Sequence, residues 1–153
     1  MGHKTFTPPV AVDRAYELWL WLEGRVQDFP TAQKHQLGRR ILDGAIDAMD
    51  ALLQATYSPR GSAERPRALH HANHRLALVR LLLRGARERR LLSIDQHEHA
   101  AKQVAELGTM VGAWLRNTQR VPTSSPAARA PAPAARPPST PPATGPAQAE
   151  PAP

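Results

Sequence analysis

The 153-residue sequence predicts an all-α protein: an antiparallel up-down four-helix bundle followed by a disordered Pro/Ala-rich C-terminal tail. Three observations support this prediction. Between residues 10 and 120, helix-breaking residues occur at only three places, apolar residues recur at helical spacing, and no stretch of alternating β-branched residues competes. The three places are residues 29–30, 58–66 and 91–93. They leave four segments joined by mostly short loops, so consecutive helices are expected to be antiparallel neighbours.

We divide the chain into an N-terminal extension (1–9), the bundle (10–120) and the tail (121–153). The tail consists mainly of Pro, Ala, Ser and Thr and has no large hydrophobic residue beyond Val121. It therefore has little to bury against the entropy of ordering, and we expect disorder with polyproline II character. Such a tail serves as a solubilising tether or as a ligand for a proline-reading domain.

The first predicted helix covers roughly residues 10–28. On a wheel of about 100 degrees per residue, one face is apolar and the opposite face is charged. The apolar face contains Val12, Ala15, Trp19, Leu22 and Val26. Trp21 is the exception, because it projects among the charged residues. Since Trp is enriched at protein interfaces, we assign Trp21 to an oligomer interface.

The second predicted helix covers residues 31–57, with Thr31 as N-cap. Its expected buried stripe comprises Leu37, Ile41, Ala45, Ala48, Met49, Leu52 and Thr56. Asp43, Asp47 and Asp50 lie on the outer face. Carboxylates at helical spacing on an outward face indicate solvated groups, or pairing with another subunit, rather than a metal site.

The third predicted helix, residues 65–92, is the most basic part of the chain, with eight arginines and one acid, Glu88. Arg80, Arg84 and Arg87 align within about 60 degrees on the wheel. The apolar residues occupy an arc of roughly 220 degrees, whereas a helix in a monomeric bundle needs little over about 100 degrees. The excess predicts burial inside the bundle and also against a second subunit, through Leu78 and Leu82. Arg75 and Arg89 fall within this arc and are therefore ambiguous.

The fourth predicted helix begins with Ser93 and Gln96, whose spacing is that of a capping box. Its expected inner face comprises His97, Ala101, Val104, Gly108, Val111 and Leu115. Gly108 and Gly112 are four residues apart, which predicts close approach of a neighbouring helix at some cost in helix propensity.

Composition and motifs argue against catalysis. Cysteine is absent, which excludes disulfides and thiolate metal sites. His70 and His74 have a ligand spacing, but no acid joins them as in a metallohydrolase motif. There is no phosphate-cradling glycine loop and no nucleophile elbow. We predict no catalytic residue, metal or cofactor. Without an apolar leader or a run of about 18 apolar residues, we expect a cytoplasmic protein with no membrane contact.

The net charge of +7 favours an anionic partner. Arginine is suited to bidentate phosphate contacts, and a rigid helix presenting a row of arginines could follow a nucleic-acid backbone without reading its sequence. The predicted nucleic-acid-binding residues are Arg75, Arg80, Arg84, Arg87, Arg39 and Lys34. The alternative is that these arginines pair with the acidic outer face of residues 31–57 in another subunit. Both roles can hold at once.

Six motifs occur in an order and spacing that resemble a known family. They are residues 16–22 (YELWLWL) followed by Phe29-Pro30, then 37–41 (LGRRI), 72–76 (ANHRL), 78–84 (LVRLLLR), 97–100 (HEHA) and 108–115 (GTMVGAWL). Together they resemble the accessory variability determinant (Avd) proteins of diversity-generating retroelements. Those proteins are relatives of the four-helix-bundle proteins encoded in intervening sequences of 23S ribosomal RNA genes. The resemblance covers about residues 10–118.

The resemblance implies a homopentameric barrel of four-helix bundles with a basic surface. It also implies binding to the retroelement reverse transcriptase and to template-repeat RNA, in support of error-prone complementary DNA synthesis that the protein does not itself catalyse. Two departures stand out. The family's last motif usually reads Gly-Arg-Met-Leu-Gly-Gly-Trp, whereas here Thr109 and Ala113 replace the Arg and the second Gly. The usual aromatic residue before Glu98 is His97.

Overall fold

A computed structural model describes residues 9–120 and residue 145. The predictions for the N-terminal extension and for the tail therefore lie almost entirely outside the described residues. The helical part of the chain lies within one compact unit, Met1–Pro122.

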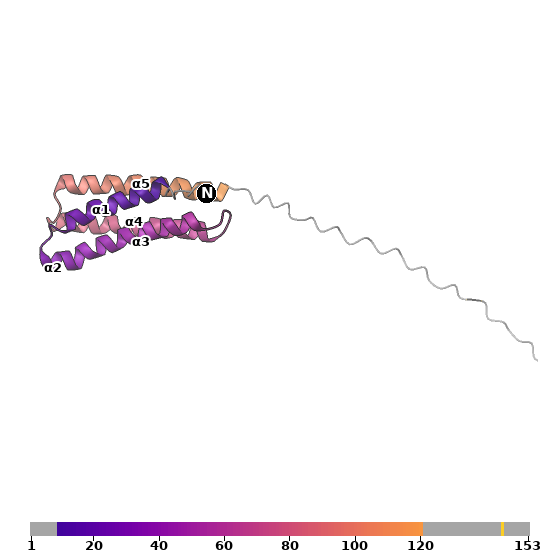
Figure 1. The fold of residues 1–153 in the computed structure, drawn as a ribbon, viewed down its shortest axis with the longest axis horizontal. Helices are drawn as coiled ribbons and strands as arrows, with labels where there is room; N and C mark the ends of the chain where they lie inside the picture. Colours follow the sequence, from indigo (N-terminus) through magenta and orange to yellow (C-terminus); the bar gives the residue numbers. More distant parts are fainter. Residues whose placement is uncertain (1–8, 121–144, 146–153) are drawn as a thin grey trace, which may run out of the picture. The chain divides into compact units, whose positions relative to one another are not determined.

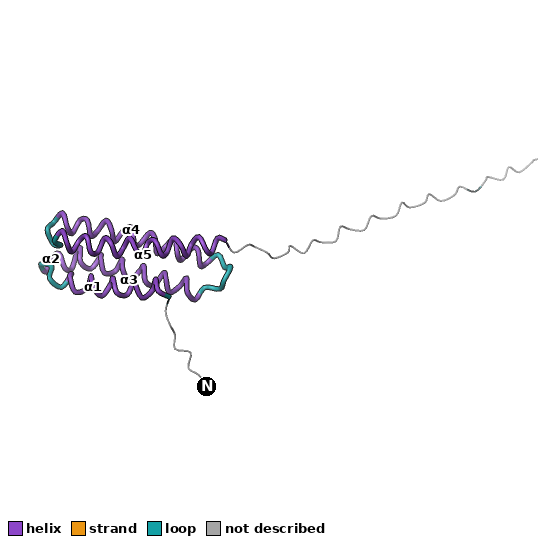
Figure 2. Tube along the Cα trace, turned by 90° about the horizontal axis from the view of Figure 1, so that it is seen from above, coloured by secondary structure: helices purple, strands orange, loops and turns teal. Residues whose placement is uncertain are grey.

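That part is a four-helix bundle without strands, which confirms the predicted fold class (Figures 1 and 2). The long helices are α1 (Val10–Val26), α3 (Arg39–Tyr57), α4 (Glu64–Glu88) and α5 (Ile94–Arg120). A short helical turn, α2 (Thr31–Gln33), and a π-helical turn, η1 (Lys34–Gly38), lead directly into α3. The helices alternate in direction, and the contacts run α1–α3, α3–α4, α4–α5 and α5–α1, so the four close a ring around one core.

The core is built almost entirely from aliphatic side chains, because each helix turns one stripe inward. The largest fully buried side chains are Leu18, Leu22, Ile41, Leu52, Leu69, Leu83, Leu107, Val79, Val104 and Val111. Most predicted core positions are confirmed in α1 and α3. In α1, however, Leu18 is fully buried and Trp19 is only half-buried. In α5 the stripe is shifted, with Ala100 and Leu107 buried in place of Ala101 and Gly108.

Close helix packing depends on a different glycine from those predicted. A Cβ on Gly108 would have open space, and one on Gly112 would meet only its own helix's Arg116. The prediction of close approach at these two glycines is therefore wrong. Gly44 is the tight position between two of the long helices: a Cβ there would lie 2.9 Å from Val79 Cγ2, where α3 and α4 cross. Gly38 is tighter still, because a Cβ there would lie 2.5 Å from Val26 Cγ1.

Of the two N-caps predicted from the sequence, one is present in the structure and the other is not. The capping box that begins α5 is confirmed, because the Gln96 N–H donates to Ser93 Oγ (3.1 Å) and the Ser93 N–H donates to Gln96 Oε1 (3.0 Å). Thr31 is not an N-cap: Pro30 occupies that position and no side chain caps the turn. Proline supplies no side-chain acceptor, and its fixed φ simply directs the chain into the helix.

The C-terminus of α4 carries an unusual residue. Arg90 has φ of 59°, the only positive φ outside glycine among the described residues. The Leu91 N–H donates to Ala86 O (2.9 Å) and the Arg90 N–H donates to Arg87 O (2.9 Å), the two bonds of a Schellman motif. Glycine is the usual residue there, since a side chain costs about 1 kcal/mol in the left-handed region. An arginine is therefore kept at this position against its backbone preference.

Two leucines on α4 allow the effect of a core substitution to be compared with that of a surface substitution. Leu83 is 1% exposed and Leu81 is 63% exposed. We expect Leu83→Ala to lower the free energy of unfolding by about 2–5 kcal/mol, because it leaves a cavity in the core. Leu81→Ala should cost less than about 1 kcal/mol. Urea denaturation followed by circular dichroism measures both, and equal losses would contradict the described core.

Candidate nucleic-acid interface

Arg80, Arg84 and Arg87 lie along the side of α4 that faces α5. The three arginines line one hollow of about 760 Å³ between the two helices. Its other lining residues are Leu81, Glu88, His97 and Ala101. We call this hollow the α4/α5 groove. Spacings of four and three residues put the guanidinium groups on successive turns, so the predicted row is present as a single surface feature.

The charges in the α4/α5 groove are only partly neutralised. Arg84 Nε lies 3.0 Å from Glu88 Oε1, and both side chains are well over half exposed. Such a surface pair contributes little, about 0–1 kcal/mol, and is readily exchanged for a stronger anion. Within residues 9–120, Arg80 and Arg87 form no ion pair. The groove therefore presents uncompensated positive charge on a rigid helix.

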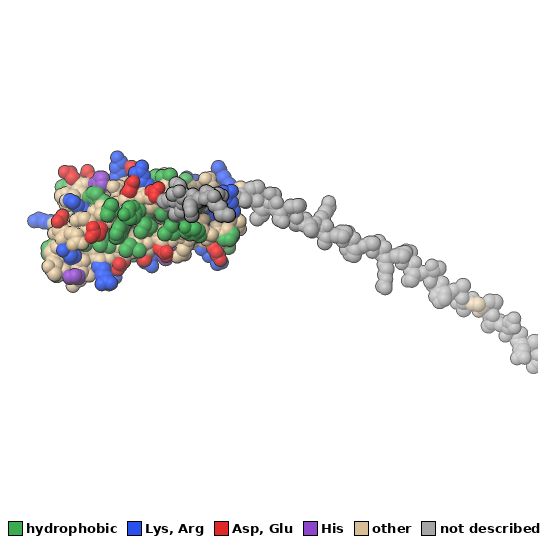
Figure 3. All heavy atoms as spheres, in the orientation of Figure 1, with side chains coloured by type: hydrophobic (Ala, Val, Ile, Leu, Met, Phe, Trp, Pro, Cys, Tyr) green, Lys and Arg blue, Asp and Glu red, His purple; other side chains and the backbone are tan. Residues whose placement is uncertain are grey.

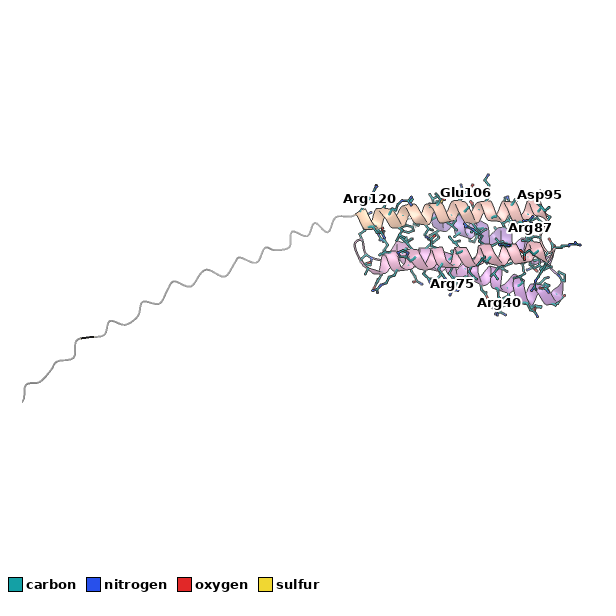
Figure 4. The ribbon with its side chains drawn as sticks, turned by 180° about the vertical axis from the view of Figure 1, so that it is seen from behind. Arg40, Arg75, Arg87, Asp95, Glu106 and Arg120 are labelled. Atoms are coloured by element: carbon teal, nitrogen blue, oxygen red, sulfur yellow. The ribbon has the colours of Figure 1, made fainter. Side chains whose placement is uncertain are left out.

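Arg75 lies on the opposite side of α4, at the seam with α3. Its Nε is 3.4 Å from Asp47 Oδ2 and 3.4 Å from His71 Nε2. In Figure 4, Arg87 lies between α4 and α5, whereas Arg75 lies on the side of α4 next to α3. The acidic outer face of α3 thus pairs with α4 of the same chain at this point. Arg75 is less available to an anionic ligand than the groove arginines.

Lys34 and Arg39 lie at the end of the bundle where α2 and η1 lead into α3. Arg39 Nε is 3.7 Å from Asp43 Oδ2 and lines a shallow hollow with His35, Gln36 and Arg40. Lys34 Nζ donates to Gln27 Oε1 at 3.5 Å. The structure therefore divides the six predicted residues among three places: the groove, the α3–α4 seam and this end of the bundle.

The end of the bundle contains cations that the sequence prediction did not include. Arg89 Nη1 donates to Gln33 Oε1 (3.3 Å), which ties the end of α4 to α2. Arg89, the left-handed Arg90 and the exposed Arg40 therefore extend the basic surface beyond the groove. Only the contact between two segments 56 residues apart reveals this cluster. A helical wheel of α4 alone could not have found it.

The three residues predicted to form an oligomer interface are each partly buried within their own chain. Trp21 is half-buried, its ring centroid 4.8 Å from that of His99 on α5 and 5.8 Å from Arg25 Cζ. Leu78 and Leu82 are also half-buried, and Leu82 packs against the core. Because α4 contacts both α3 and α5, most of its wide apolar arc is covered without a second subunit.

A more exposed apolar surface lies on α1 and α3, at residues that the sequence prediction did not select for an interface. Tyr16 and Leu20 on α1 are 50% and 51% exposed, and Ile46 on α3 is 42% exposed. Figure 3 shows apolar side chains gathered over these two helices. The signal was present in the sequence, since these three residues are large and apolar but fall outside the predicted core faces.

Other chemistry has no support among residues 9–120. No group of three or more His, Cys, Asp or Glu side chains there is arranged to hold a metal ion. None of the described helices is both long enough and apolar enough to pass through a membrane.

The bAvd-like family matches residues 10–118, which is nearly the whole bundle. The protein belongs to this family. The resemblance noted from the six motifs is confirmed, and the match ends two residues before the end of α5. Among curated protein sequences, no significant match was found.

A solved structure supports the bAvd-like fold independently. It is a protein of unknown function from the S23 ribosomal protein family of Bacteroides thetaiotaomicron, with a TM-score of 0.65 and 14% sequence identity. The similarity covers 70% of this chain and 96% of that one. At this identity the comparison establishes the shared four-helix fold alone.

Proposed function

We propose that this bAvd-like protein is a non-enzymatic accessory protein of a diversity-generating retroelement. It binds the retroelement's reverse transcriptase and its template RNA, and supports mutagenic complementary DNA synthesis without catalysing it. The observation that supports this proposal is the arginine row of the α4/α5 groove, together with family membership over residues 10–118. The protein acts in the cytoplasm as a homo-oligomer, a pentamer by analogy with Avd proteins.

The groove fits a nucleic-acid backbone physically. From Arg80 to Arg87 the helix rises about 10 Å, at about 1.5 Å per residue. Arginines over that length can each meet a phosphate of one strand, and each contact releases counterions. Such contacts fix the position of the nucleic acid but do not read its sequence. A protein that holds RNA in this way can position a template for a polymerase without selecting its sequence.

Two alternative functions differ from the proposed one. The first is a four-helix-bundle protein of the 23S ribosomal RNA intervening-sequence type, which the S23-family structure favours. A reverse transcriptase gene and paired repeats next to this gene favour the retroelement, and their absence argues against it. The second is a purely structural bundle whose arginines only hold subunits together.

Neutralising the groove tests the nucleic-acid role. We expect the combined Arg80→Gln, Arg84→Gln and Arg87→Gln variant to bind RNA about 10- to 100-fold more weakly at about 0.1 M salt. The slope of log affinity against log salt should fall in magnitude by about 2–3, because each lost phosphate contact removes about 0.7–0.9. Fluorescence anisotropy with a labelled RNA over a salt series measures both quantities.

A charge-matched control carries Lys102→Gln, Arg116→Gln and Arg120→Gln, three exposed cations elsewhere on α5. It should keep most of the affinity and the slope. If the groove variant instead binds RNA normally while the oligomer dissociates, the groove arginines hold subunits together and the nucleic-acid role is wrong.

Partnership with a polymerase has its own test. When the protein is expressed with the reverse transcriptase of a neighbouring retroelement, we expect the two to co-purify together with RNA from the template repeat. Sequencing of the bound RNA identifies it. Recovery of ribosomal RNA without the polymerase would favour the intervening-sequence alternative.

A further inference from the structure

The exposed apolar surface on α1 and α3, which we call the α1/α3 face, is a contiguous feature. Tyr16 and Leu20 are one turn apart on α1, and α1 packs directly against α3, which contributes Ile46. Beside them lie half-buried side chains that also pack on the core: Trp19, Leu42, Met49 and Leu53. Exposed apolar groups that cluster in this way mark an interaction site more often than a solvated surface.

Four carboxylates lie along the border of the α1/α3 face, and two of them are paired with arginines of their own helices, Arg14 and Arg39. By helical spacing, Asp13 and Glu17 lie next to this face on α1, and Asp43 and Asp50 lie next to it on α3. Figure 3 shows acidic side chains beside the apolar patch. All four side chains are exposed. Glu17 and Asp43 have ion pairs to neighbours on their own helices, at 3.0 and 3.7 Å. Asp50 only accepts a hydrogen bond from Gln54 (2.7 Å). An apolar surface with this border fits a partner that brings leucines flanked by cations.

The same border disfavours pairing of the α1/α3 face with itself. In a two-fold contact the same patch meets its own copy, so carboxylates would approach carboxylates around the apolar centre. Like charges brought together at an interface cost affinity. A head-to-tail contact, in which two different surfaces meet, avoids this repulsion.

A complementary surface is present on α4. His74, Leu78 and Leu81 follow one another at four and three residues, so they form one stripe along the outer side of the helix. Arg67, seven residues before His74, adds an exposed cation to the same stripe. Leu81 is mostly exposed and Leu78 half-buried. Since the outer side of α4 faces away from the core, this stripe cannot reach the α1/α3 face of its own chain.

We infer that the α1/α3 face binds the outer stripe of α4 of a second copy of this chain. This inference rests on the homo-oligomer of the proposed function and specifies which surfaces meet. The contact is heterologous, so it closes into a ring or extends as a fibre according to its rotation. Arg80, Arg84 and Arg87 stand on the α5 side of the stripe, so every copy keeps its groove in an equivalent position.

Complementation between two variants tests the inference. One variant carries Leu20→Glu and Ile46→Glu, and the other carries His74→Glu and Leu81→Glu. Each should be monomeric in sedimentation velocity at concentrations where the unaltered chain is oligomeric, with association at least about 10-fold weaker. An equimolar mixture should form a heterodimer, because one intact α1/α3 face and one intact α4 stripe remain. A control, Ile94→Glu, changes a residue that is 60% exposed outside both surfaces and should stay oligomeric.

Several outcomes would overturn the inference. They are a monomeric unaltered chain, an oligomer that survives either pair of substitutions, and a mixture that stays monomeric. Circular dichroism of each variant checks that the helices persist. RNA affinity, measured separately, reports on the groove, so the Leu20→Glu, Ile46→Glu variant should still bind RNA. Loss of assembly with retained RNA binding separates this inference from the groove's role.

Cross-linking provides a second readout that does not depend on disruptive substitutions. The chain contains no cysteine, so Ile46→Cys and Leu81→Cys can each be made as the sole thiol. Oxidation of a mixture should give the mixed disulfide in preference to either homodimer. Preferential Ile46→Cys homodimers would show that the α1/α3 face pairs with itself and would contradict the head-to-tail contact.

Discussion

The packing of α4 between two neighbours constrains the rest of the structure. This helix carries both the densest arginines and many leucines, and it contacts α3 on one side and α5 on the other. Leu69, Leu76 and Leu83 fill the core, and several of its cations lie at the two edges. On the α3 edge, Arg75 meets Asp47. On the α5 edge, Arg80 and Arg87 form no ion pair within residues 9–120.

This sorting explains why a single helix can be a structural element and an electrostatic surface together. The basic surface continues past the groove, because the Arg89–Gln33 hydrogen bond brings the end of α4 against α2. Arg90 adds a cation there although its left-handed backbone favours glycine. Groove and bundle end together form a basic surface, while the acid-bordered α1/α3 face belongs to the other helix pair.

Much of the fold followed from helical periodicity, because a 3.6-residue stripe identifies a core face to within about one residue. The error in α5 was of this size, since Ala101 and Gly108 each have a buried neighbour, Ala100 and Leu107. Periodicity does not reveal which neighbour lies on which side of a helix. It therefore could not separate Arg75 from Arg80, nor show that Leu82 would pack against the core of its own chain. The tight crossing at Gly44 and the junction of Arg89 with Gln33 likewise depend on contacts between distant segments.

The proposed function places nucleic acid in the α4/α5 groove. Ultraviolet cross-linking of the protein to RNA, followed by mass spectrometry of the modified peptides, tests this location most directly. RNA bound in the groove should give cross-links concentrated around Arg84 and His97, with weaker ones near His35 at the basic end of the bundle. Cross-links concentrated at Tyr16 and Ile46, with none along α4 and α5, would contradict it.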